Sequence, residues 1–118
     1  MKKIYHLATC NTCQRILSEI APSDDVTLQE LKENPITETQ LETLRAHTDS
    51  YEQLFNRRAQ LYRKRGLHEQ TLSETDYKNL ILEHYTFLKR PVMILEEDIF
   101  IGNNKKTVAA AKEALANN

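Results

Sequence analysis

Residues 2–21 read KKIYHLATCNTCQRILSEIA, and this stretch decides the fold because a strand-like segment stands directly before a helix-like one. The first part, KKIYHLA, is a short apolar run that contains the strand-favouring types Ile and Tyr. The second part carries Ile16, Leu17 and Ile20 at helical spacing. We therefore expect a strand that runs into a helix, with the chain's two cysteines between them.

The next segments predict a second strand followed by a helical region. VTLQEL, which begins at Val26, alternates apolar and polar residues as a strand does. Thr37 has the position of a helix N-cap, with Gln40 three residues on as its capping-box partner. The stretch from Tyr51 shows helical repeats that stop at Gly66, a residue suited to the left-handed conformation at a helix end.

The last part of the chain predicts a helix, a hairpin and another helix. Ser73 marks the start of an amphipathic helix, whose expected inner face consists of Tyr77, Leu80, Ile81 and Tyr85. The pair Arg90 and Pro91 ends the helical pattern. PVMIL and DIFIG then read as two strands of a hairpin around an acidic turn. The Ala-rich segment that follows is a predicted helix with Asn103 or Asn104 as its cap.

This order of elements predicts an α/β fold. A βαβ unit gives a parallel crossover and a hairpin adds antiparallel strands, so the expected sheet is mixed and four-stranded. The layout is that of a thioredoxin-like (glutaredoxin-like) domain with a helical insertion at about residues 36–90. A length of 118 residues fits one domain, so we expect a single domain over residues 1–118.

Composition excludes several classes of function. The formal net charge is -1 with 28% charged residues, which does not suit a general nucleic-acid binder, so no direct nucleic-acid partner is expected. No run approaches the ~18 apolar residues that cross a bilayer, and the basic N-terminus lacks a secretory apolar region. We therefore expect a cytoplasmic protein without a membrane partner. In that reducing compartment a permanent structural disulfide is not expected.

Cys10 and Cys13 remain open to three interpretations: metal ligation, inert burial and reactive thiol chemistry. Zinc needs two further ligands at recognisable spacing. The four histidines are scattered along the chain, at His6, His47, His68 and His84. We therefore expect no metal. Inert burial fits because free cysteine is among the most buried residue types. The position between a strand and a helix N-terminus instead favours a thiolate, since helix N–H groups stabilise negative charge there.

On the reactive interpretation, Cys10 is the expected nucleophile. Cys13 lies in the first turn, where it can attack an adduct on Cys10 and close a disulfide. Backbone N–H groups of the segment from Asn11 through Thr12 to Cys13 are candidate donors to a tetrahedral oxyanion bonded to Cys10.

Guanidinium groups suit such an oxyanion because their planar fork donates two parallel hydrogen bonds. The candidates are the adjacent pair Arg57 and Arg58, and Arg90 before the hairpin. The alternative for the basic stretch from 57 to 65 is a solvated helix face, or a patch that holds nucleic acid or an acidic protein.

Four segments, TCNTCQR, LFNRRAQLYRK, LKRPVMIL and IGNNKKTV, resemble in order and separation the family that joins glutaredoxin-coupled arsenate reductases and Spx-type transcriptional regulators. The similarity runs nearly end to end. It implies a thioredoxin-like fold, a nucleophilic thiolate at Cys10 and a cis proline at Pro91 after Arg90. In these reductases three arginines surround the oxyanion. Arg90 matches the second of them, and the first corresponds to Arg57 or Arg58, with Arg58 preferred.

The chain departs from the reductase pattern at two places. Asn103 stands near the position of the third arginine, and a neutral amide cannot supply that charge. Loss of one charge-assisted contact would weaken arsenate binding by about 1.5–3 kcal/mol. The second departure is Cys13, because a cysteine there resembles the redox switch of the Spx-type regulators and is unusual in the glutaredoxin-coupled reductases.

Together these features predict a thiol-dependent oxidoreductase that reduces arsenate, or a related oxyanion or disulfide, through Cys10. The resemblance implies glutathione with glutaredoxin as electron donor and partner, and thioredoxin is the other candidate because Cys13 could make glutathione unnecessary. We expect no bound cofactor and a monomer. A redox-sensing Spx-type regulator that binds RNA polymerase is the alternative, and a non-catalytic binding module is a third.

Overall fold

A computed structural model describes residues 1–117 and divides the chain into two compact units. We call the first the sheet unit; it contains Met1–Asn34 and the segment from Arg90 onward. We call the second the helical unit; it is Pro35–Lys89. That the whole chain acts as a single domain stays a prediction, and the two units are described one after the other.

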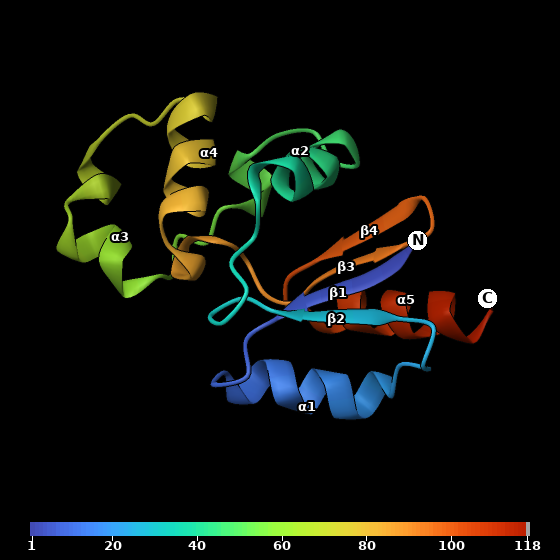
Figure 1. The fold of residues 1–118 in the computed structure, drawn as a ribbon. Helices are drawn as coiled ribbons and strands as arrows, with labels where there is room; N and C mark the ends of the chain where they lie inside the picture. Colours follow the sequence, from blue (N-terminus) through green and yellow to red (C-terminus); the bar gives the residue numbers. More distant parts are fainter. Residues whose placement is uncertain (118) are drawn as a thin grey trace. The chain divides into compact units, whose positions relative to one another are not determined.

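Within the described residues, four strands form one mixed sheet in the order β2-β1-β3-β4 (Figure 1): β1 Lys2–His6, β2 Thr27–Glu30, β3 Val92–Leu95 and β4 Asp98–Ile101. β1 runs parallel to β2, with Ile4 opposite Leu28. β1 is antiparallel to β3, with Ile4 opposite Met93, and β3 is antiparallel to β4. The α/β fold with a mixed four-stranded sheet, predicted from the order of elements, is confirmed.

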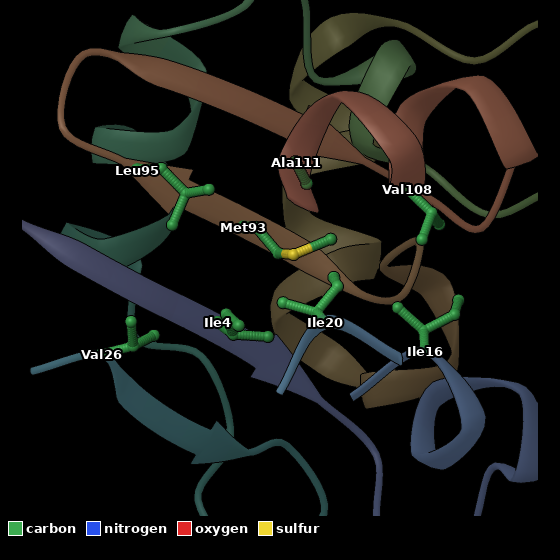
Figure 2. Close-up of a cluster of buried hydrophobic side chains, with 8 residues drawn as sticks. All are labelled: Ile4, Ile16, Ile20, Val26, Met93, Leu95, Val108 and Ala111. Atoms are coloured by element: carbon green, nitrogen blue, oxygen red, sulfur yellow. The ribbon is translucent and has the colours of Figure 1, made fainter. Parts of the chain in front are cut away.

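Two helices of the sheet unit share one hydrophobic cluster: α1, Asn11–Ile20, and α5, Lys105–Ala116. Figure 2 shows that side chains from both helices converge on those of the central strands; the cluster contains Ile4, Ile16, Ile20, Val26, Met93, Leu95, Val108 and Ala111. Because both helices contribute to one cluster, they cover the same face of the sheet. The cap of α5 is Asn104, whose side chain accepts the Lys106 N–H at 2.8 Å.

The buried face of α1 includes a cysteine as well as aliphatic residues. Cys13, Ile16 and Ile20 are all buried and follow each other at intervals of three and four residues. The helix ends where Ala21 adopts a left-handed conformation with φ 47° and donates its N–H to Leu17 O. Packing of this face fixes the rotation of the helix, and with it the direction of its first turn.

The helical unit contains three α-helices among its described residues, α2 Glu38–Ala46, α3 Gln60–Lys64 and α4 Glu74–Glu83. A short 3-10 turn follows each of them in the chain, at Glu52–Leu54, Leu67–Glu69 and Tyr85–Phe87. The capping box at the start of α2 is confirmed, because the Thr37 hydroxyl accepts the Gln40 N–H and the Gln40 side chain accepts the Thr37 N–H. Ser73 and Asp76 form a second one before α4.

Two details of the helical region differ from the sequence-based expectation. The repeats from Tyr51 to Gly66 do not form one helix, because Phe55 pairs with Leu88 in a β-bridge and Asn56 N–H donates to Phe87 O at 2.8 Å. Gly66 does adopt the expected left-handed conformation, with φ 68°.

Tyr85 is also not on the inner face of α4. The helix ends at Glu83, and the extended backbone of His84 directs the chain into a new turn. The fully buried aromatic residue of that turn is Phe87. Long-range packing of Phe87 against Phe55, with ring centroids 5.3 Å apart, therefore overrides the local helical pattern.

Candidate active site: the Cys10 and Cys13 thiol pair

Cys10 lies where the chain leaves the sheet and enters α1. It is the N-cap residue of the helix, with the extended dihedrals φ -95° and ψ 111°. Its N–H donates to Leu7 O at 3.1 Å, and its own carbonyl accepts the Gln14 N–H at 3.1 Å. Cys10 is partly exposed. The thiol therefore stands at the positive end of the helix and remains within reach of solutes.

The surroundings of Cys10 favour its thiolate. Partial burial acts to raise the pKa of Cys10, but several groups together lower it below its ordinary value of 9.0. These are the backbone N–H of Cys13, the Cys13 thiol, the charge of Arg90 and the backbone N–H of Thr12, in order of decreasing effect. Two of the three expected backbone donors therefore act on the sulfur. Asn11 is exposed at the first position of α1.

Cys13 has the opposite character. Its side chain is 0% exposed, and burial raises its pKa from 9.0 to about 11. The nearby Cys10 sulfur acts in the same direction, whereas the Leu7 N–H and the Arg90 charge oppose the rise. Both cysteines are free thiols in the structure. The pair thus consists of a Cys10 sulfur whose thiolate form is stabilised and a Cys13 thiol that is protonated at neutral pH and donates a hydrogen bond to it.

Arg90 enters this site from the segment that precedes β3. The Arg90–Pro91 peptide is cis, as the family resemblance implies. Gly102 N–H donates to Pro91 O at 2.9 Å and so ties the loop between β4 and α5 to the same segment. Asn103 follows in this loop and is exposed. Of the predicted arginines, Arg90 is the one in the sheet unit together with the thiol pair.

Arg57 and Arg58 belong to the helical unit and have different surroundings within it. The Arg57 guanidinium pairs with Glu52, donates to the Tyr77 hydroxyl at 3.1 Å and lies over the Tyr77 ring. The pairing with Glu52 raises the pKa of Arg57. Arg58 is exposed, and its side chain forms no ion pair with any residue in the described part of the chain. Its backbone N–H donates to Asn56 Oδ1 at 3.0 Å.

Sequence reasoning did not single out three polar residues: Gln14 and Glu30, which bind the backbone of the loop before Cys10, and Asn56, which binds the backbone at Arg58 within the helical unit. Gln14 Nε2 donates to Leu7 O at 3.1 Å, and Glu30 Oε2 accepts the Ala8 N–H at 2.8 Å. Asn56 holds the turn at Arg58. A signal existed only for Asn56, since asparagine commonly binds the backbone two residues on. Gln14 and Glu30 bind partners that lie 7 and 22 positions away, so no local pattern indicates them.

Residues 1–117 contain neither a candidate metal-binding cluster nor a helix that could span a membrane. No group of three or more His, Cys, Asp or Glu side chains there could hold a metal ion. None of the helices formed by these residues has both the length and the apolar character needed to cross a membrane.

A mixed four-stranded sheet with a thiol pair at the N-terminus of its first helix defines a thioredoxin-like thiol protein. Residues 5–111 match the model of the ArsC family, and the chain belongs to that family. The resemblance stated from the four sequence segments is thus confirmed.

Relatives carry the names of both branches of this family. The "Global transcriptional regulator Spx 2" of Bacillus anthracis is 24% identical over 110 residues, which cover 92% of this chain and 84% of the relative. An arsenate reductase from Vibrio cholerae has a TM-score of 0.76 at 17% identity, with 92% of this chain and 95% of that chain covered. An arsenate reductase related protein from Brucella melitensis has a TM-score of 0.68 at 21% identity, with 92% of each chain covered. The two solved structures establish a shared fold.

Proposed function

We propose that this protein is a thiol-dependent oxidoreductase of the ArsC family that reduces arsenate or a related oxyanion through Cys10. The observation that carries the proposal is the electrostatic environment of Cys10, whose pKa is lowered by the N–H groups of Thr12 and Cys13 and by Arg90. A thiolate at neutral pH is the form of cysteine that attacks an electrophilic centre. The same donors suit the negative oxygens of a tetrahedral oxyanion.

In the proposed reaction the Cys10 thiolate bonds to arsenic, and one arsenate oxygen leaves as water after taking up protons. A second thiol then forms an S–S bond with the Cys10 sulfur while the As–S bond breaks. The electron pair of that bond stays on arsenic, which passes from As(V) to As(III), and the two thiols are oxidised to a disulfide. Glutathione or Cys13 is the second thiol, and glutaredoxin or thioredoxin reduces the disulfide afterwards. No bound cofactor is required by this scheme.

Arg90 is the proposed oxyanion-binding residue of the sheet unit. We also expect Arg58, rather than Arg57, to contribute, because the Arg57 guanidinium is occupied by Glu52 and Tyr77. Because Asn103 stands in place of a third arginine and carries no charge, arsenate binding is expected to be weak. Another oxyanion or a disulfide is therefore an alternative substrate.

The test is arsenate-dependent oxidation of NADPH in the presence of glutathione, glutathione reductase and glutaredoxin. Activity above that of a Cys10→Ser variant is the expected result. The thioredoxin system is assayed in parallel, because Cys13 could make glutathione unnecessary. Activity with thioredoxin that disappears in Cys13→Ser would identify Cys13 as the second thiol. If wild type and Cys10→Ser are equal in both systems, the reductase proposal is wrong.

A second candidate function is that of a redox-sensing regulator that binds RNA polymerase. It is favoured by the contact of Cys13 with Cys10, which would allow a disulfide switch, and by the regulator among the relatives. A pull-down with purified RNA polymerase, under oxidising and reducing conditions, separates the two functions. Polymerase binding that changes with redox state in wild type, and not in Cys13→Ser, supports the regulator. Binding in neither state, together with an unreactive Cys10, would leave a non-catalytic family member.

A further inference from the structure

Gln14 encloses the peptide groups of Cys10 in a ring of three hydrogen bonds. Cys10 N–H donates to Leu7 O at 3.1 Å, and Gln14 N–H donates to Cys10 O at 3.1 Å. The ring closes through the Gln14 side chain, whose Nε2 donates to the same Leu7 carbonyl at 3.1 Å. Leu7 O therefore accepts two hydrogen bonds, one from the backbone N–H of Cys10 and one from the side chain of Gln14, which lies one helical turn after Cys10. Both peptide groups that flank the Cys10 side chain are thereby held.

We propose that Gln14 is a positioning residue that fixes the turn from Leu7 to Cys10, and so holds the Cys10 sulfur against the free N–H groups of α1. This inference rests on the proposed role of Cys10 as the reactive thiol. Gln14 acts through the backbone and does not itself contact the substrate.

The physical reason lies in the direction of the Cys10 side chain. The donors on Thr12 and Cys13 belong to the rigid first turn of α1, whereas Cys10 has the extended dihedrals of an N-cap. Rotation about the Cys10 backbone would move the sulfur away from those donors without unfolding the helix. The backbone of Leu7 contacts both cysteines, because its carbonyl accepts the Cys10 N–H and its own N–H faces the Cys13 sulfur.

The charged and titratable groups around the turn come from four elements. Cys13 on α1 and Arg90 before β3 face the Cys10 sulfur. His6 at the end of β1 has its Nδ1 3.5 Å from Gln14 Nε2, and Glu30 at the end of β2 binds the Ala8 N–H. Burial lowers the pKa of His6, and backbone N–H groups lower that of Glu30. Both shifts move these groups further below the range in which thiols titrate, so a profile recorded above pH 7 reports mainly the thiols.

The experiment measures the rate at which iodoacetamide alkylates Cys10 of the reduced full chain between pH 7 and pH 10, with the modified residue identified by mass spectrometry. Gln14→Met keeps the length of the side chain and removes the donor. Gln14→Glu replaces the donor with a carboxylate that repels Leu7 O. Ser18→Ala, at an exposed position one turn further along α1, is the matched control.

We expect Gln14→Met to slow alkylation at pH 7 about threefold to tenfold, which is the effect of losing one neutral hydrogen bond, and to approach the wild-type rate at high pH. Gln14→Glu should be slower still, and Ser18→Ala should match wild type. A Gln14→Met profile that coincides with wild type, or that is lowered equally at every pH, would overturn the positioning role. These outcomes differ from failure of the proposed function, in which wild-type Cys10 itself reacts as an ordinary thiol or arsenate is not reduced.

Discussion

High pH should weaken the fold through Cys13, by an amount that follows from the burial of its thiol. The folded state raises the pKa of Cys13 from 9.0 to about 11, mainly because the side chain is 0% exposed. The folded chain then holds this proton more tightly than the unfolded chain does. The resulting stability is fully present below pH 9 and is lost as the pH rises through 11. One pKa unit corresponds to about 1.4 kcal/mol, so the loss is about 1 kcal/mol at pH 10 and about 2 kcal/mol at pH 11.

The measurement compares wild type with Cys13→Ala by urea unfolding in the presence of a reductant, at pH 8 and at pH 11. Far-UV circular dichroism follows the transition, because the chain has no tryptophan. Alkaline pH also affects other groups: burial raises the pKa of Tyr5, and the hydrogen bond to Asp25 raises that of Lys2. They are present in both proteins, so their contributions cancel in the difference. The advantage of wild type over Cys13→Ala should shrink by about 2 kcal/mol between the two pH values.

Cys10 requires a second comparison, because removal of Cys13 also removes a group that lowers the pKa of Cys10. The same pair is therefore measured in a Cys10→Ser background, in which Cys13 is the one remaining thiol. Burial still raises the Cys13 pKa there, while the Cys10 sulfur no longer adds to the rise. The difference should again shrink with pH, by a smaller amount. If it stays constant in both backgrounds, the Cys13 thiol is not desolvated as the structure indicates.

Three further predictions concern the core and the arginines. Ile4→Ala should lower the free energy of unfolding by about 2–5 kcal/mol, because Ile4 is 0% exposed. Leu28, which pairs with Ile4 in the sheet, is 48% exposed, so Leu28→Ala should lower it by about 1 kcal/mol. Equal losses for the two variants in urea unfolding would contradict this difference. Arg58→Met should raise the KM for arsenate roughly tenfold to a hundredfold, and Arg57→Met should raise it much less. A larger increase in KM for Arg57→Met than for Arg58→Met in steady-state assays would contradict the choice of Arg58. Asn103→Arg should lower that KM about tenfold or more, and an unchanged KM would show that this loop does not contact the oxyanion.

The elements that local signals specify were predictable from the sequence. The capping box of Thr37 and Gln40 was one such signal, because its partners are three residues apart and its hydrogen bonds need no tertiary context. The break in the helical region was not predictable. It depends on Asn56 N–H reaching Phe87 O and on Phe55 pairing with Leu88, and these partners are more than thirty positions apart. The apolar residues of this segment keep helical spacing, although the backbone at Phe55 and Asn56 pairs with Leu88 and Phe87 instead of continuing a helix.

The candidate site shows the same division. The position of Cys10 between a strand and the start of a helix followed from periodicity alone. The difference between Arg57 and Arg58 did not, because it depends on Glu52 and on Tyr77, which comes from α4. Gln14 had no signal either, since its side-chain amide binds a carbonyl seven residues back across the turn.

The amino-acid sequence by itself determined the order of strands and helices and the place of two thiols at a helix N-terminus, because these depend on contacts within one or two turns of chain. Only the tertiary structure decided that the two thiols have opposite acidity. Burial of Cys13 on the inner face of α1 raises its pKa, whereas free helix N–H groups and Arg90, which is eighty positions away in the chain, lower that of Cys10. Desolvation and charge act through space, so the acidity of each sulfur was set when the helix packed on the sheet.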